Sequence, residues 1–207
     1  MTDRYWTIAR PGGAEIEVKR SRFLCSLGRV ADEAEARAFI DEVRRRHWDA
    51  RHNCSAFVLG PDGATARSSD DGEPAGTAGA PMLDVLRGAG VSDVAAVVTR
   101  YFGGILLGAG GLVRAYGDAV GAGLASVGLL ERQRMRLFSV DVDHAQAGRV
   151  ENDLRSRGVT VRGTSYGERA RIRLAVLPDL DFEPLLAEIS GGELGATPEG
   201  EDWVDMA

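Results

Sequence analysis

Residues that could bind a ligand are concentrated between positions 66 and 114. An acidic cluster leads into a glycine-rich turn, GEPAGTAG, and consists of Asp70, Asp71 and Glu73. Backbone N–H groups at Gly76 and Thr77, where a loop is expected to become a helix, favour an anion. No Gly-Lys-Ser/Thr follows, so this is not a Walker loop. The carboxylates fit two roles: they can hold a hard cation, or they can cap the following helix.

A second candidate group lies at the end of the apolar run VAAVVTRYFGG. Arg100 interrupts this run, and a charge in such a position is either paired or faces a groove. A salt bridge to the acidic cluster is one interpretation. The other is an anion-binding groove in which arginines and backbone amides contact phosphate oxygens. The predicted groove is lined by His52, Ser68, Ser69, Asp70, Asp71, Glu73, Gly76, Thr77, Arg100, Tyr101 and Arg114.

The cysteines do not predict catalysis. His52 and Cys54 share one face of a strand, but neighbours two apart are separated by about 6.5–7 Å, beyond hydrogen-bond reach. Cys25 and Cys54 form neither a disulfide framework nor a zinc site, and we expect both to be buried. The sequence therefore predicts no catalytic residue and no cofactor, and it favours a binding surface over a catalytic centre.

The first part of the chain alternates strand and helix patterns. Asp32, with Glu35 three residues later, predicts the start of a helix through a capping box. The continuous β-branched run predicts a central strand buried on both faces. The expected elements are two strands within 16–30, a helix from Asp32 to the arginines at 44–46, a hairpin of Cys54–Leu59 and Ala64–Ser69, a helix at Thr77–Leu86, a strand at Val94–Tyr101 and a helix at Gly110–Val127.

The remainder predicts a ferredoxin-like unit. A charged linker, Glu131–Arg136, precedes an alternating strand. The pattern continues with a helix at Ala147–Gly158, a hairpin of Val159–Ser165 and Arg169–Leu177, a helix at Asp179–Ser190 and a weak final strand, which gives the order βαββαβ. Arginines at 169, 171 and 173 are expected to form cross-strand charge pairs with Asp141 and Asp143. The fold class is α+β with two domains, residues 1–130 and 131–207.

Composition limits the function classes. The net charge of −6 and the pI of 5.2 exclude a basic footprint over the whole chain, although a local basic groove remains compatible with them. No run approaches about 18 apolar residues, so no membrane span is expected. The first residues, MTDRYWTIARPGG, lack a signal-peptide pattern. We therefore expect a cytoplasmic protein, and a monomer.

Three blocks in this order and spacing resemble the signature of the Impact family, in particular its bacterial YigZ-like branch: DARHNCSAFVLG (Asp49–Gly60), SSDDGEPAGTAGAPML (Ser68–Leu83) and VVTRYFGGILLGAGGLVRAYGDAV (Val97–Val120). The resemblance covers the first domain strongly, and the second is similar to the family's small C-terminal domain in pattern. It implies an N-terminal α+β domain like the second domain of a small-subunit ribosomal protein and the fourth domain of elongation factor G. It also implies a ferredoxin-like second domain. Eukaryotic Impact proteins act in translational control by binding a regulator of an initiation-factor kinase.

The main prediction is a non-enzymatic, translation-associated regulatory or binding protein whose groove contacts RNA or the ribosome. One alternative is a metal-dependent hydrolase of a phosphate-containing small molecule, with the acidic cluster on the cation and His52 as acid/base. The other is a protein–protein interaction module. It would dock a protein partner on the helix face that carries Gly110, Gly117 and Gly121, where each interior glycine costs roughly 0.5–1 kcal/mol relative to alanine.

Overall fold

The computed structural model describes residues 2–206 and divides into two compact units. The first unit ends at Glu131 and the second runs from Arg132 to Met206. Within the described residues, no helix is long and apolar enough to cross a membrane.

The first unit is a sheet covered by helices on both faces. Its sheet has the strand order β2-β3-β6-β4-β5, and every pair in it is antiparallel. The elements are β1 (Arg4–Ile8), β2 (Gly12–Val18), β3 (Ser21–Arg29), α1 (Glu33–Arg46), β4 (His52–Leu59), β5 (Thr65–Ser69), α2 (Gly79–Gly88), β6 (Val94–Tyr101) and α3 (Ala109–Val127).

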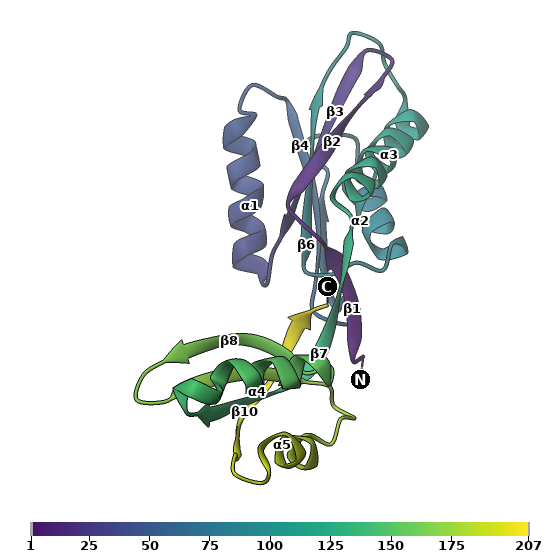
Figure 1. Ribbon diagram of the computed structural model, residues 1–207. Helices are drawn as coiled ribbons and strands as arrows, with labels where there is room; N and C mark the ends of the chain where they lie inside the picture. Colours follow the sequence, from purple (N-terminus) through teal and green to yellow (C-terminus); the bar gives the residue numbers. More distant parts are fainter. Residues whose placement is uncertain (1, 207) are drawn as a thin grey trace. The chain divides into compact units, whose positions relative to one another are not determined.

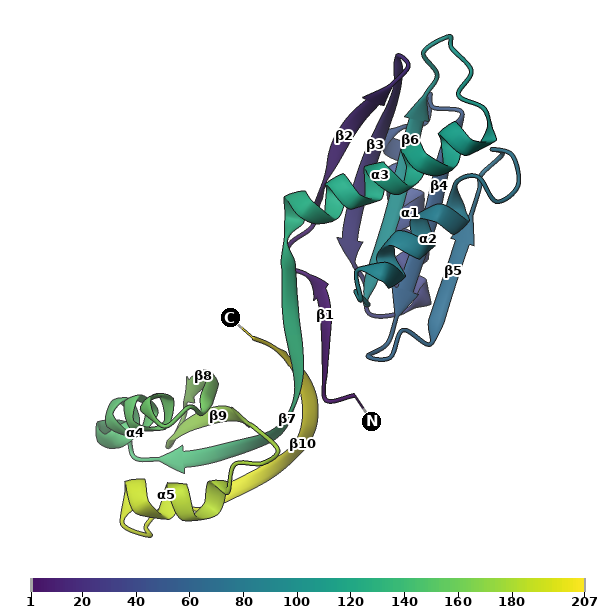
Figure 2. The same cartoon turned by 90° about the vertical axis from the view of Figure 1, so that its right-hand side faces the viewer.

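The continuous apolar run is the central strand, as predicted. Figure 1 shows α1 on one side of the sheet and α2 and α3 on the other. Val94, Ala96 and Val98 of β6 enter the core beneath α2 and α3, whereas Ala95 and Val97 enter the core beneath α1. Because both faces of β6 are buried, its sequence shows no polar alternation. In Figure 2, α3 lies over β2, β3 and β6, and α2 lies over the β4–β5 side.

Local signals placed the helix ends closely. The Asp32 carboxylate accepts a hydrogen bond from the Glu35 N–H at 2.8 Å, which confirms the predicted N-cap. Glu35 reaches back and accepts from the Ala31 N–H at 2.8 Å. The helix predicted at Thr77–Leu86 runs instead from Gly79 to Gly88. The amide of Thr77 donates to the Pro74 carbonyl in the preceding turn, so this residue lies before the helix.

The second unit is ferredoxin-like, as predicted. Its elements are β7 (Leu129–Val142), α4 (His144–Ser156), β8 (Thr160–Tyr166), β9 (Ala170–Val176), α5 (Phe182–Ser190) and β10 (Ala196–Asp205). The strands are ordered β10-β7-β9-β8 with antiparallel pairing throughout. Phe138, Val140 and Val142 of β7 pack in one core with side chains of α4 and α5.

The charged segment Glu131–Arg136 contains the division between the two units, as predicted, but it is part of the strand β7 and not an irregular linker. Gln133 and Met135 are buried between less buried neighbours, which is a strand alternation that the charged residues masked. The final strand pairs along it, from Asp205 opposite Arg132 to Ala196 opposite Val140. Its acids neutralise the arginines of β7: Arg134 lies 2.6 Å from Glu201.

Two of the three arginines expected to form charge pairs in the second unit do so, whereas Arg173 has no ion-pair partner within residues 2–206. Arg171 donates from Nε and Nη2 to the two carboxylate oxygens of Asp141, at 2.7 and 2.8 Å. Arg169 lies 3.0 Å from Asp143. Both pairs are solvent-exposed, and Asp141, Arg169 and Arg171 lie in the lining of a hollow of about 490 Å³.

Candidate functional site

Asp70 caps the N-terminus of α2. One carboxylate oxygen accepts from the amides of Ala78 and Gly79, at 3.0 and 2.8 Å, and the other accepts from Gly76 at 2.8 Å. Burial opposes ionisation of Asp70, but these N–H donors hold its pKa below the ordinary value. The prediction that the amides after Gly76 are free for an external anion is therefore wrong, because the chain supplies its own anion there.

Asp71 is directed toward β4 and α1. Its carboxylate accepts from Arg44 Nη2 and from the backbone N–H of Asn53, both at 2.7 Å. Its own carbonyl lies 3.0 Å from His52 Nδ1, and Ser69 Oγ accepts from its N–H at 3.3 Å. These contacts attach the acidic loop to the start of β4. The Asp71 carboxylate therefore bonds to groups of its own chain and stabilises the fold.

Glu73 forms the buried ion pair that one interpretation of Arg100 predicted. Its Oε1 accepts from Arg100 Nη1 at 2.7 Å and from the Tyr116 hydroxyl at 2.8 Å. Only 8% of the Arg100 side chain and 3% of the Glu73 side chain are exposed. Burial raises the pKa of Tyr116, which keeps its hydroxyl a neutral donor. The Arg100 guanidinium also lies 5.6 and 5.5 Å from the ring centres of Phe23 and Phe102.

The acidic cluster does not converge on one point. Each carboxylate serves a different set of donors, and no group of three or more His, Cys, Asp or Glu residues within 2–206 is arranged to hold a metal ion. The Cys54 thiol donates to the Asp70 carbonyl at 3.0 Å. Burial raises the pKa of both Cys25 and Cys54 to about 12, so both are protonated at neutral pH.

A pocket of about 400 Å³ opens at the end of the sheet where β4 begins and β6 ends. His52 and Arg100 are register partners on these strands. The pocket is lined by Asp49, Ala50, Arg51, His52, Arg100, Tyr101, Phe102 and Leu106.

Only part of the predicted groove meets at this pocket. His52, Arg100 and Tyr101 line it. Ser68 and Ser69 are exposed on β5, and Arg114 is exposed on α3, none of them in the pocket lining. The members of the predicted groove from Asp70 to Thr77 form the internally bonded loop before α2.

Polar contacts hold Tyr101, a residue of the pocket lining, in one position. Its hydroxyl donates to Asp49 Oδ1 at 3.1 Å and lies 3.0 Å from His47 Nδ1. Burial, together with the hydrogen bond to Asp49, raises the pKa of Tyr101. The Arg22 guanidinium lies over its ring, 5.7 Å from the centre. The Tyr101 ring is thus held in place before any ligand arrives.

Apolar side chains project into solvent beside the pocket. Phe102 is 50% exposed, Leu106 is 82% exposed, and Trp48, next to the pocket residue Asp49, is 83% exposed. The sequence prediction gave no role to Asp49, Arg51 and Leu106, whereas it offered Phe102, with Tyr101, as a ring that stacks or packs. The position of the three residues was the signal for them: Asp49 and Arg51 precede His52 in the loop before β4, and Leu106 lies in the glycine-containing loop after Tyr101.

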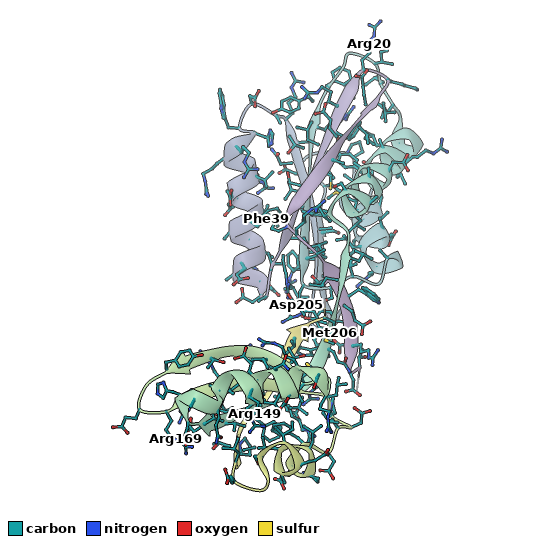
Figure 3. All side chains as sticks on the ribbon, viewed as in Figure 1. Arg20, Phe39, Arg149, Arg169, Asp205 and Met206 are labelled. Atoms are coloured by element: carbon teal, nitrogen blue, oxygen red, sulfur yellow. The ribbon has the colours of Figure 1, made fainter. Side chains whose placement is uncertain are left out.

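The turn between β2 and β3 adds positive charge at the same end. Arg20 lies at the tip of the first unit (Figure 3). Gly103 packs against this turn so closely that a Cβ atom there would lie 2.0 Å from the Arg20 carbonyl carbon, and its N–H donates to Ser21 Oγ at 3.1 Å. Within residues 2–206, Lys19, Arg20, Arg45 and Arg51 have no ion-pair partner. We call the pocket with Lys19, Arg20, Arg45 and Trp48 the pocket end.

The helix glycines do not form one closely packed surface. A Cβ atom at Gly123 would lie 2.8 Å from Cys25 Sγ, so this glycine is required by packing on β3. A Cβ atom at Gly117, which is half-buried, would make an ordinary 3.5 Å contact with Val85, and one at Gly110 or Gly121 would meet nothing within 4 Å. Close packing therefore explains Gly123, but not Gly110, Gly117 or Gly121.

Comparisons with known proteins identify the family. The family model described as the Impact N-terminal domain matches residues 19–124, and a domain of unknown function, DUF1949, matches residues 140–193. IMPACT family member YvyE of Bacillus subtilis is 46% identical over 176 residues, which cover 85% of this chain and 81% of that protein. The chain belongs to the Impact family.

Other members of the Impact family extend this relationship over nearly the whole chain. IMPACT family member YigZ of Escherichia coli is 40% identical over 195 residues, covering 91% of this chain and 95% of its own length. A solved structure described as the crystal structure of a hypothetical protein has a TM-score of 0.64 and 37% identity, and the match covers 95% of this chain and 97% of that one. The predicted resemblance and the α+β two-domain fold are confirmed.

Proposed function

We propose that this Impact-family chain is a non-enzymatic binding protein associated with translation, and that its pocket end contacts single-stranded RNA, including exposed strands of the ribosome. The observation that carries the proposal is the combination, at one end of one sheet, of exposed aromatic rings with cations that have no ion-pair partner. Proteins that bind single strands use this combination, because bases stack on aromatic faces and phosphates pair with arginine.

Exposed rings for stacking are present in the pocket lining and next to a lining residue in sequence. Phe102 exposes half of its surface, and Trp48 is almost fully exposed. A solvated aromatic ring of this kind contributes little to folding, whereas base stacking on it contributes about 1–3 kcal/mol per base. The family relationship supports the same surface, since the Impact N-terminal domain match includes every residue of the pocket.

The acidic net charge is compatible with local RNA binding. Asp70, Asp71 and Glu73 are each bonded to donors within the fold, so their charges are largely balanced where they lie. Lys19, Arg20 and Arg51 face solvent without such balance. An overall charge of −6 should weaken nonspecific attraction to duplex nucleic acid, while the local cations still attract a strand at short range.

The same geometry supports a non-enzymatic role. Both thiols are buried with raised pKa values, and the carboxylates of the acidic cluster already serve as cap and ion-pair partners. A hydrolase would have to detach these groups from bonds that hold the loop before α2 in place. Binding at the pocket end requires no such change.

The test is RNA affinity as a function of salt. In the double variant Arg20→Glu, Arg51→Glu, we expect the affinity for a labelled single-stranded RNA to fall at least about tenfold at 100 mM salt. The slope of log affinity against log salt should also become shallower by about 1.4, because each of the two lost phosphate contacts contributes roughly 0.7. Fluorescence anisotropy measures both, and co-sedimentation with ribosomes extends the result to the larger target.

Arg87→Glu is the matched control, because Arg87 is also exposed but lies in the last turn of α2, before the opposite end of β6. It should change affinity little. Salt-insensitive binding, equal losses in the control, or no binding to RNA or ribosomes would each contradict the proposed function.

A further inference from the structure

The floor of the pocket contains a buried guanidinium with unused hydrogen-bonding capacity. Arg100 donates from Nη1 to Glu73, but its buried Nε has no hydrogen-bond partner in the described structure. Only 8% of the side chain is exposed, yet Arg100 is part of the pocket lining. A buried donor without an acceptor is costly, so such a group is expected where an acceptor arrives from outside.

A second cation lies on the same lining, since Arg51 is exposed without an ion pair in residues 2–206. His52 is half-buried and its Nδ1–H donates to the Asp71 carbonyl, so its Nε2 accepts in the neutral ring and donates only when the ring carries two protons. The one carboxylate in the lining, Asp49, accepts from the Tyr101 hydroxyl. Two arginines match the multiple oxygens of a phosphate, and His52 adds a third donor in its doubly protonated form.

The size and walls of the pocket indicate what carries that phosphate. A volume of about 400 Å³ is at the small end of the range for ligand pockets, about 300–1,000 Å³, and suits a single nucleotide. Phe102 and Leu106 supply an apolar wall, and Tyr101 supplies a fixed ring. A base can therefore lie against the wall while its phosphate points toward Arg100.

The donors of the lining also favour one position in the strand. The Arg100 guanidinium lies against the rings of Phe23 and Phe102 and pairs with Glu73 through Nη1. An internal phosphodiester offers the remaining donors one charge and two free oxygens. A terminal phosphomonoester carries nearly two charges and three free oxygens, so it can satisfy more of them.

We propose that the pocket binds the phosphorylated terminal nucleotide of an RNA strand. This inference rests on the proposed function and makes it specific. The cations and rings around the pocket contact the RNA strand, and the pocket itself holds the phosphorylated end of that strand.

The experiment compares RNA decamers of one sequence that carry a 5′-phosphate, a 3′-phosphate or only hydroxyl ends, with an internal fluorophore, by anisotropy. One phosphorylated decamer should bind about tenfold more tightly than the hydroxyl form, because a phosphomonoester gains charge-assisted hydrogen bonds. In Arg51→Ala and His52→Gln this preference should shrink to less than about threefold, because the phosphorylated decamer loses more affinity than the hydroxyl decamer does. Arg87→Ala is the control and should retain the preference.

The outcomes separate the two proposals. Equal affinity for all three decamers would overturn end recognition and leave RNA binding intact. No binding of any decamer would overturn both proposals. Competition with adenosine 5′-monophosphate and with adenosine identifies the source of the phosphate: displacement of the phosphorylated decamer by the monophosphate alone supports the pocket assignment. Binding of the monophosphate without any RNA binding would show a free-nucleotide site and overturn end recognition.

Discussion

The acidic loop Asp70–Gly79 and the pocket end carry similar residue types but use them in opposite ways. In the loop, each carboxylate meets donors from its own chain: the amides before and at the start of α2, Arg44, or the Arg100–Tyr116 pair. At the pocket end, arginines and aromatic rings remain in solvent. Residues that look functional in sequence therefore divide into a group that builds the fold and a group that is left free to bind. Arg100 belongs to both, since it pairs with Glu73 and lines the pocket.

The strongest test of the comparison is Glu73→Ala. Removing this carboxylate leaves the buried Arg100 charge without its counterion and the Tyr116 hydroxyl without its acceptor. We expect a loss of about 3–5 kcal/mol in the free energy of unfolding, the usual cost of breaking a buried pair from one side. Urea denaturation followed by tryptophan fluorescence measures it, because Trp6 and Trp48 both lie in the first unit.

Glu42→Ala is the matched control for this loss. Glu42 pairs with Arg46 on α1 at 2.6 Å, but both side chains are 57% exposed, so we expect a change of only about 0–1 kcal/mol. If the two variants were equally stable, the ion pair at Arg100 would not be essential to the fold. Where Glu73→Ala shows the expected loss, the double variant Glu73→Leu, Arg100→Met should recover much of it, because it buries no unpaired charge.

A smaller loss is expected for Asp70→Ala, about 2 kcal/mol, because three amides before and at the start of α2 lose a charged acceptor. The folded-state pKa of Asp70 lies below its ordinary value of 3.8. Its contribution is therefore fully present above that value and is lost as pH falls through the lower folded-state pKa.

The measurement is the unfolding free energy of the wild type and of Asp70→Asn between pH 7 and pH 3. The asparagine keeps the shape and one acceptor oxygen but has no charge to titrate. The difference between the two proteins should be largest at neutral pH and should shrink as pH falls below the ordinary carboxyl value. A constant difference across this range would show that the Asp70 charge contributes nothing to the cap.

Much of the fold could be predicted from local patterns. The β-branched run at Val94–Tyr101 fixes a strand buried on both faces, and the Asp32–Glu35 pair fixes the start of α1. The segment at Glu131–Arg136 does not show its strand in the sequence, because its arginines are neutralised by β10, a strand more than 60 residues later in the chain. A charged strand resembles a linker in the sequence when the residues that neutralise its charges lie far away along the chain.

The candidate site was harder to predict, for a related reason. Sequence proximity grouped the acidic loop with Arg100, but it could not show that Asp70 bends back onto the amides of Ala78 and Gly79. It also could not show that Arg51 and Leu106 meet across the pocket, since these residues are brought together by the β4–β6 pairing of His52 with Arg100. Hydrogen bonds within the chain decide which polar groups remain for a ligand.

The smallest effect is expected at Asp141 in the second unit. Asp141 makes two good hydrogen bonds to Arg171, and this side-chain contact lowers its pKa despite some desolvation. The pair is exposed, however, so water replaces it readily when one partner is removed. Asp141→Ala should leave the urea midpoint of the second unit unchanged within replicate scatter, measured by Trp203 fluorescence or amide exchange. A clear loss would mean that geometry rather than burial decides the value of an arginine–carboxylate pair in this protein, and the contrast drawn from Glu73 would then fail.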